Sequence, residues 1–194
     1  TTIWGASSSW TLTALPLFVW MGEILFRTKL SENLFEGLAP WLQKLPGGLI
    51  HVNVVGCALF AAISGSSAAT VATVGKMSIP ELRKRKYPEK ILLGSLAGSG
   101  TLGLLIPPSI ILIIYGVTVQ ESIAKLFIAG IIPGIMIALI FMGYVIIWSL
   151  LNKNKMPLTE ENYSFLNKLS KSKQLIPVIL LILGVIGSIY TGIA

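Results

Sequence analysis

The chain has 194 residues, of which 54% are hydrophobic and only 12% are charged, and its net charge is +7. Soluble domains carry about 25% charged residues, so this composition excludes an ordinary soluble domain and indicates a membrane protein. Fourteen of the fifteen Lys and Arg residues lie in three polar stretches, 27–46, 76–90 and 151–173. Because these stretches flank apolar runs, their charge indicates the cytoplasmic side of a membrane. A nucleic-acid site would need a folded basic face instead, so we expect no nucleic-acid partner.

Several apolar runs are long enough to cross a bilayer, which takes about 20 mainly apolar residues. We predict a spanning helix within 1–27, a second over 118–150 and the start of another over 175–194. Between the last two, 151–174 is predicted to be a cytoplasmic loop. Residues 28–46 repeat leucine at helical spacing among Glu and Gln, which predicts an amphipathic helix along the interface.

Residues 47–80 carry a cluster of small residues in the middle of an apolar run. A single crossing would put the polar stretches on either side of this segment on opposite faces of the membrane. A re-entrant hairpin with its tip near Ser64 to Ser67 would make all three basic stretches cytoplasmic, including the loop 76–90, so the charge favours the hairpin. A non-helical tip at membrane depth persists only where it is buried in protein or lines a wet cavity. We therefore expect 63–70 to line a binding site.

The next apolar run, 91–117, contains two consecutive prolines, Pro107 and Pro108, after several glycines. Proline lacks a backbone donor and clashes with the preceding helical turn, so this run predicts a broken helix. The carbonyls freed by such a break hold Na⁺ in transporters, and half-helix N-termini face anionic substrates. Carbonyl and hydroxyl oxygens suit a hard cation.

The two interruptions lie within fifty residues of each other and form a pair. Small and hydroxyl residues supply both: Ser64, Gly65, Ser66, Ser67 and Thr70 at the tip, and Gly98, Ser99, Thr101, Gly103 and Ser109 along the break. The alternative explanation is close helix packing, which small residues also permit. The combination of SGSS with IPPS favours a binding site.

ISGSSAATVATVG (63–75) followed by GSLAGSGTLGLLIPPSIILIIYG (94–116) resembles the large membrane subunit of tripartite ATP-independent periplasmic (TRAP) transporters. LPLFVWMGEI (15–24) and LFIAGIIPGI (126–135) agree with this resemblance. It implies an all-α membrane protein of the bacterial inner membrane, with transmembrane helices, a re-entrant hairpin and a broken helix. The chain would be one half of an inverted-repeat, elevator-type transporter. It also implies Na⁺-driven import of small organic acids, such as dicarboxylates or sialic acid, with a small membrane subunit and a periplasmic solute-binding protein.

The resemblance implies roles for residues of both interruptions. The implied sodium ligands are Ser64, Ser66, Ser67, Gly98, Thr101 and Gly103. The residues implied to lie near the substrate are Gly65, Thr70, Ser99, Pro107, Pro108 and Ser109. The resemblance also implies a second, inverted half, which would carry its own sodium site and an arginine for the substrate carboxylate. Because the chain ends inside an apolar run, we expect it to be about half of a larger membrane protein.

Two other classes of function remain open. One is a Na⁺-coupled elevator carrier of organic anions that works without a binding protein. The other is a membrane subunit or membrane enzyme that does not transport. No cluster of His, Cys or acidic residues in the sequence could perform acid–base or metal chemistry, which argues against an enzyme. Glu23 is the only acid within a predicted span, so neutral oxygens and Na⁺ fit better than proton coupling.

Overall fold

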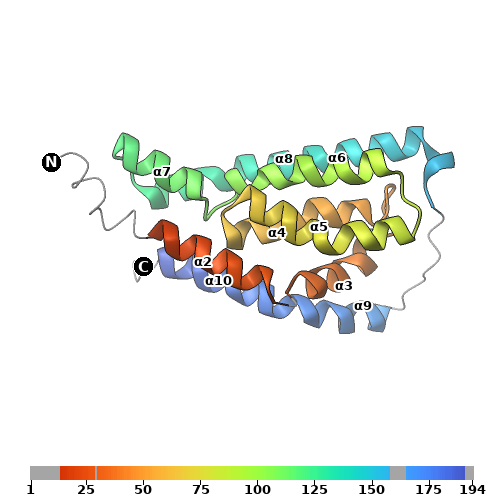
Figure 1. Ribbon diagram of the computed structural model, residues 1–194, viewed down its shortest axis with the longest axis horizontal. Coiled ribbons are helices and arrows are strands. Elements are labelled where there is room, and N and C mark those ends of the chain that lie inside the picture. Colours follow the sequence, from red (N-terminus) through yellow and green to blue (C-terminus); the bar gives the residue numbers. More distant parts are fainter. Residues whose placement is uncertain (1–13, 29, 158–164, 191–194) are drawn as a thin grey trace.

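The computed structural model describes residues 14–28, 30–157 and 165–190, and the residues it describes form helices and turns without a strand. The all-α prediction is confirmed. The molecule is an elongated bundle in which α8 (Ile123–Leu151) runs along most of the long axis (Figure 1). The first part of the predicted span 1–27 and the last residues of 175–194 lie outside the described residues.

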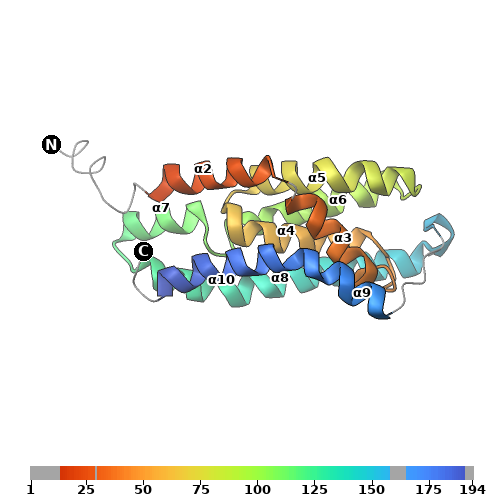
Figure 2. The same cartoon turned by 90° about the horizontal axis from the view of Figure 1, so that it is seen from below.

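Helices α4 (Ile50–Ser64) and α5 (Ser67–Lys84) form a hairpin, whose turn lies near the middle of the long axis in both views (Figures 1 and 2). The open end of the hairpin lies at the end of the molecule where α8 finishes. α4 is the centre of the core, since side chains such as Phe60 and Ile63 are fully buried. The hairpin therefore reaches only partway along the bundle.

The hairpin turn has a local cause in its two residues. Gly65 ends α4 in a left-handed conformation with φ +59°, which glycine adopts without steric penalty. Ser66 is extended and caps α5, because its side chain accepts a hydrogen bond from the Ala69 amide. The chain reverses within these two residues.

The next helix is interrupted. α6 (Glu89–Gly100) passes into a 3₁₀ turn, η2 (Thr101–Leu104), and α7 (Ile110–Val119) begins only after five residues that lack helical structure. The Pro107–Pro108 peptide bond within this gap is cis. Neither proline can donate a helical hydrogen bond, so the gap coincides with the residues that cannot continue a helix.

Four helices form a second layer beside the hairpin, along the lower side of Figure 1: α2 (Ala14–Phe26), α3 (Leu30–Leu42), α9 (Phe165–Ser172) and α10 (Ile176–Tyr190). The connection from α9 to α10 is a 3₁₀ turn, η4 (Lys173–Leu175). α3 buries Leu34 and Leu38 and exposes Glu32 and Glu36, as an amphipathic helix does.

The segment 151–174, which the sequence predicts to be a loop, contains helical structure. A short 3₁₀ turn, η3 (Lys153–Lys155), follows α8, and α9 then leads into α10. α9 is fixed to α3 by a hydrogen bond from Trp41 Nε1 to Ser172 Oγ of 2.8 Å, and Lys168 Nζ lies 5.4 Å from the centre of the Trp41 ring. These contacts make α9 part of the second layer.

Two helical segments of the described chain are long and apolar enough to cross a membrane, Ile123–Leu151 and Asn167–Ser188. The 29 residues of α8 extend about 44 Å, more than the roughly 30 Å of a hydrocarbon core. Large apolar side chains on α8 point outward, and Ile132 and Leu151 are 76% and 79% exposed. Such a surface suits lipid.

Candidate functional site

The hairpin tip and the helix break meet directly. The Ile110 amide, at the start of α7, donates a hydrogen bond of 3.2 Å to the Gly65 carbonyl oxygen. A Cβ atom on Gly65 would lie 2.7 Å from the Pro108 carbonyl oxygen. On the other side of the tip, a Cβ on Gly103 would lie 2.8 Å from the Ser67 amide nitrogen. The tip is therefore held between η2 and the first residue of α7.

Four helix ends converge where the hairpin tip meets the helix break, a junction that we call the crossing. The C-terminal ends of α4 and η2 present carbonyl groups that lack partners within their own helix, with partial negative charge. The N-terminal ends of α5 and α7 present amide groups with partial positive charge. The crossing therefore offers one environment for a cation and another for an anion within a few residues.

The hydroxyl groups of the tip form a small buried network. Ser64 Oγ lies 3.0 Å from Thr70 Oγ1, and Thr70 Oγ1 donates to the Ser66 carbonyl oxygen over 2.8 Å. Ser67 Oγ is buried and has no hydrogen-bond partner among the described residues. A buried hydroxyl without a partner costs about 1–3 kcal/mol, so this atom is suited to an additional ligand.

The hydroxyl groups along the break bond to nearby carbonyl groups of the same interrupted segment. Ser109 Oγ donates to the Leu104 carbonyl oxygen over 2.7 Å and bridges the non-helical gap. Thr101 Oγ1 donates to the Gly98 carbonyl oxygen over 2.7 Å, and Ser99 Oγ donates to the Ser95 carbonyl oxygen. These bonds partly satisfy the backbone groups that the interruption leaves open.

The predicted site residues fall into two groups. Those at the crossing are Ser64, Gly65, Ser66, Ser67, Thr70, Gly103, Pro108 and Ser109. The others, Gly98, Ser99, Thr101 and Pro107, face elsewhere, and Pro107 lies toward α8, because its Cδ would be 3.8 Å from a Cβ on Gly130. The Cβ direction of Gly98 points at the Phe141 ring of α8, 3.4 Å away, the Thr101 side chain is exposed, and the Ser99 hydroxyl is directed along α6.

Three further residues support the site, although the sequence analysis does not single them out. Asn53, buried in α4, donates to Ser95 Oγ over 3.0 Å and joins the hairpin to α6. The non-helical segment 105–109 packs closely on Gly130 and Gly134 of α8, because a Cβ at either position would lie 2.8 Å from an atom of that segment. The spacing of two glycines four residues apart in a span is a recognised sign of close helix contact and could have identified them.

Gly100 tests whether α5 and α6 pack as closely as the structure shows. A Cβ on Gly100 would collide with Val71 Cγ2 of α5. Gly100→Ala is therefore expected to lower the free energy of unfolding by about 1–3 kcal/mol through overpacking. Adding Val71→Ala removes the colliding methyl group, so the double variant should recover most of this loss. Thermal unfolding in detergent of the wild type, the two single variants and the double variant measures this recovery. If the effects of the two substitutions on stability simply add, the close contact is contradicted.

Comparisons with known proteins identify the family. Residues 1–194 match the family described as "Tripartite ATP-independent periplasmic transporter, DctM component". The chain belongs to this family. It is 36% identical over 186 residues to the C4-dicarboxylate TRAP transporter large permease of Pseudomonas aeruginosa, with 96% of this chain and 43% of the relative covered. The family is one of transporter components, and this relative is named as a permease, not as an enzyme.

Other relatives carry different substrate names. The chain is 34% identical to the ectoine/5-hydroxyectoine large permease of Ruegeria pomeroyi, over 94% of this chain and 42% of the relative. It is 38% identical to the sialic acid large permease of Vibrio cholerae, over 73% of this chain and 34% of the relative. The chain spans less than half the length of these relatives, and its similar identity to all three does not select one substrate.

Proposed function

We propose that the full-length protein is the large permease of a Na⁺-coupled TRAP-type importer of small organic acids in the bacterial inner membrane. It would work with a small membrane subunit and a periplasmic solute-binding protein. The observation that carries the proposal is the crossing itself, where the hairpin tip is held between the two sides of a broken helix. Discontinuous helices of this kind form the ion and substrate sites of secondary transporters.

The proposed sodium site lies between the tip and η2. Ser67 Oγ is the buried hydroxyl without a partner there, and Gly103 brings the η2 backbone against the Ser66–Ser67 peptide. Carbonyl oxygens at the ends of α4 and η2 would complete a set of neutral oxygens, which suits Na⁺. Glu23 of α2 is exposed and forms an ion pair of 2.9 Å with Arg27, so it does not offer a buried carboxyl group for proton coupling. This supports Na⁺ rather than H⁺ as the coupling ion.

The proposed substrate position lies beside the N-terminal ends of α5 and α7. Their amide groups favour a negatively charged group, such as a carboxylate. This end of the crossing contains Gly65, Pro108 and Ser109. Because Gly65 has no side chain, its backbone atoms would face the substrate directly. The relatives' names include a C4-dicarboxylate and sialic acid, which supports an organic acid for this chain.

The proposed topology makes α4 and α5 a re-entrant hairpin. The loops from α3 to α4 and from α5 to α6 lie at the same end of the bundle as the end of α8, and the α7–α8 connection lies at the opposite end (Figure 1). Lys or Arg residues occur in the two loops and directly after α8, but not in the α7–α8 connection. The positive-inside rule, which counts Lys and Arg, would therefore place the end of the bundle with the two loops in the cytoplasm. In an elevator mechanism, the hairpin and α6 would then move against the second layer of α2, α3, α9 and α10.

Sodium dependence tests the proposal. In proteoliposomes that contain the full-length permease with its small subunit and binding protein, uptake should require an inward Na⁺ gradient. A C4-dicarboxylate, sialic acid, ectoine and isethionate, taken from the relatives' names, form the substrate panel. Transport of any of them at full rate without a Na⁺ gradient would refute the coupling.

Ser67→Ala tests the ion site without knowledge of the substrate. The variant should need about tenfold more Na⁺ than the wild type for half-maximal thermal stabilisation, measured against K⁺ at constant ionic strength. Ser78→Ala is the matched control, because Ser78 is a buried serine of the same helix whose hydroxyl also lacks a partner among the described residues. Equal effects of the two substitutions would place the ion elsewhere.

A further inference from the structure

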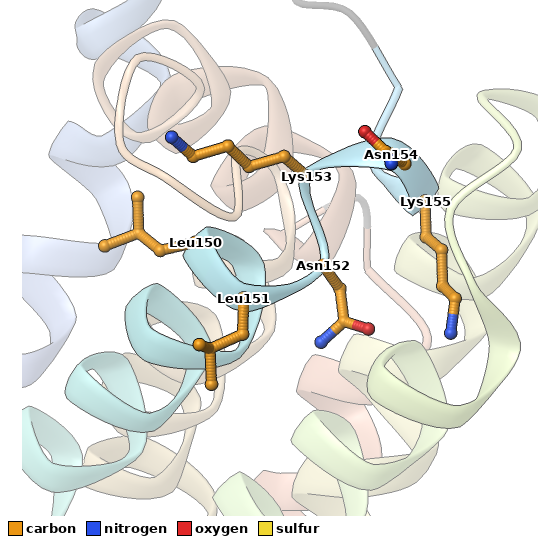
Figure 3. A pocket seen from close by; sticks show the side chains of 6 residues that line it. All are labelled: Leu150, Leu151, Asn152, Lys153, Asn154 and Lys155. Atoms are coloured by element: carbon orange, nitrogen blue, oxygen red, sulfur yellow. The ribbon is translucent and has the colours of Figure 1, made fainter.

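Two adjoining cavities lie at the end of α8, away from the crossing. The first has a volume of about 320 Å³ and lies between residues 44–48, Tyr87 and the last turn of α8. The second, of about 390 Å³, is lined by residues 150–155, whose side chains Figure 3 shows. Leu150 and Lys153 line both cavities, so the two lie side by side, and we refer to them together as the depression.

The charged side chains that line this depression, among the described residues, are all basic. Lys44 and Lys153 line the first cavity and Lys155 lines the second, and among the described residues that line them none is acidic. None of these lysines forms an ion pair with another residue in the part of the chain that the structure describes. A cleft of about 530 Å³ between α3 and α5 differs, because glutamates and basic residues line it together. The depression at the end of α8 therefore favours an anion.

The walls of the first cavity are held firmly in place. Gly47 has φ +103°, and a Cβ there would lie 2.6 Å from Val145 Cγ1, so the loop lies directly on α8. The Tyr87 hydroxyl accepts a hydrogen bond of 3.1 Å from the Leu49 amide, which leaves its own proton for another acceptor. Burial raises the pKa of Tyr87, so this hydroxyl stays protonated at neutral pH. The cavity offers two ammonium groups and one hydroxyl donor.

An apolar surface adjoins the lysines. Ile147, Leu150 and Leu151 are 61%, 48% and 79% exposed on the last two turns of α8. In Figure 3, Leu150 and Leu151 extend from the end of the helix, while Lys153 and Lys155 extend from the turn that follows it. A free phosphate ion would use only the polar part of this surface. A phospholipid would use both parts, with its phosphate at the lysines and an acyl chain along the helix.

We propose that this depression binds the headgroup of an anionic phospholipid of the cytoplasmic leaflet. The phosphate lies between Lys44 and Lys153, the Tyr87 hydroxyl donates to it, and one acyl chain follows the exposed side of α8. Lys44 belongs to the segment that leads into the hairpin, and Lys153 follows α8. The lipid thus joins the entrance of the hairpin to a long spanning helix.

The test compares lipid binding by three forms of the full-length permease, purified in a neutral detergent. These are the wild type, a cavity variant and a control variant. The cavity variant combines Lys44→Gln with Lys153→Gln, and the control variant combines Lys84→Gln with Lys90→Gln. The control removes the same charge from exposed lysines of another basic stretch, 76–90. Short-chain phosphatidylglycerol, phosphatidylcholine of the same chain length, and inorganic phosphate are titrated and followed by native mass spectrometry and thermal stabilisation.

We expect the wild type and the control to bind phosphatidylglycerol in preference to phosphatidylcholine, at one site per permease. The affinity of the cavity variant for phosphatidylglycerol should fall by about 10- to 30-fold, since each lysine near a bilayer surface contributes about 1 kcal/mol. Glutamine keeps much of the lysine stem, and an unchanged circular dichroism spectrum checks that the variant is folded. Equal losses in the cavity and control variants would overturn the proposal. So would wild-type binding without a headgroup preference, or saturation by inorganic phosphate at the same concentration.

Discussion

Gly103→Ala is expected to reduce Na⁺-driven uptake by the full-length permease at least tenfold. A Cβ at this position would lie 2.8 Å from the Ser67 amide nitrogen, 2.9 Å from the Ser66 carbonyl carbon and 3.0 Å from Ser67 Cα. All three are main-chain atoms, so no side chain can rotate away to relieve the overlap. The hairpin tip must move away from η2, at a cost of about 1–3 kcal/mol, and the proposed sodium ligands separate. Uptake in proteoliposomes against the Na⁺ concentration measures the loss.

Gly94→Ala is the control for this prediction. Gly94 belongs to α6, the same interrupted helix, and a Cβ there would have no atom within 4 Å. Alanine favours helix more than glycine does, so this variant should fold and transport normally. Wild-type uptake by Gly103→Ala would show that the tip and η2 need not touch during transport.

Gly65→Ala is expected to reduce uptake to a similar extent for two separate reasons. The residue has φ +59°, a left-handed conformation that costs other residues about 1–2 kcal/mol. Its Cβ would also lie 2.7 Å from the Pro108 carbonyl oxygen. Relief of that overlap requires the tip to withdraw from the break, which lengthens the hydrogen bond from the Ile110 amide to the Gly65 carbonyl oxygen. The measurement is initial uptake with both Na⁺ and substrate at saturating concentrations.

Gly56→Ala, within α4, is the control for Gly65→Ala, because it makes the same substitution without a close contact. A Cβ on Gly56 would lie 3.6 Å from Val74 Cγ1, an ordinary van der Waals distance. Amide hydrogen exchange of α7 adds a second measurement for Gly65→Ala, because protection of the Ile110 amide should fall in that variant and stay unchanged in the control. Unchanged protection together with full transport would contradict the role of the turn.

The sequence predicts where the backbone departs from helix, because glycine and proline act on the backbone directly. SGSS contains the turn at Gly65 and Ser66, and the double proline lies in the gap before α7. The orientation of the small residues within the broken helix could not be predicted. A 3₁₀ turn has 3.0 residues per turn instead of 3.6, so it rotates every side chain relative to the preceding helix. In this turn Gly103 faces the tip, while Thr101 is exposed.

Contacts between distant segments explain the other differences. The polarity of 151–174 predicts a loop, but α9 forms there against α3, where Ser172 accepts a hydrogen bond from Trp41, 131 residues earlier in the chain. The role of Asn53 likewise depends on Ser95 of another helix. The sequence pattern of one segment does not predict its contacts with distant segments. Helix propensity and polarity depend on the residues of that segment and on solvent only.

The hydrogen bond between the Ile110 amide and the Gly65 carbonyl oxygen also bears on the order of assembly. The first amides of a helix have no partner within it, and Ile110 finds its acceptor in a turn 45 residues nearer the N-terminus. A ribosome delivers that turn to the membrane first. The completed hairpin can then provide the acceptor for the first amide of α7. Translation therefore makes the hairpin turn and α7 in the order in which this hydrogen bond needs them.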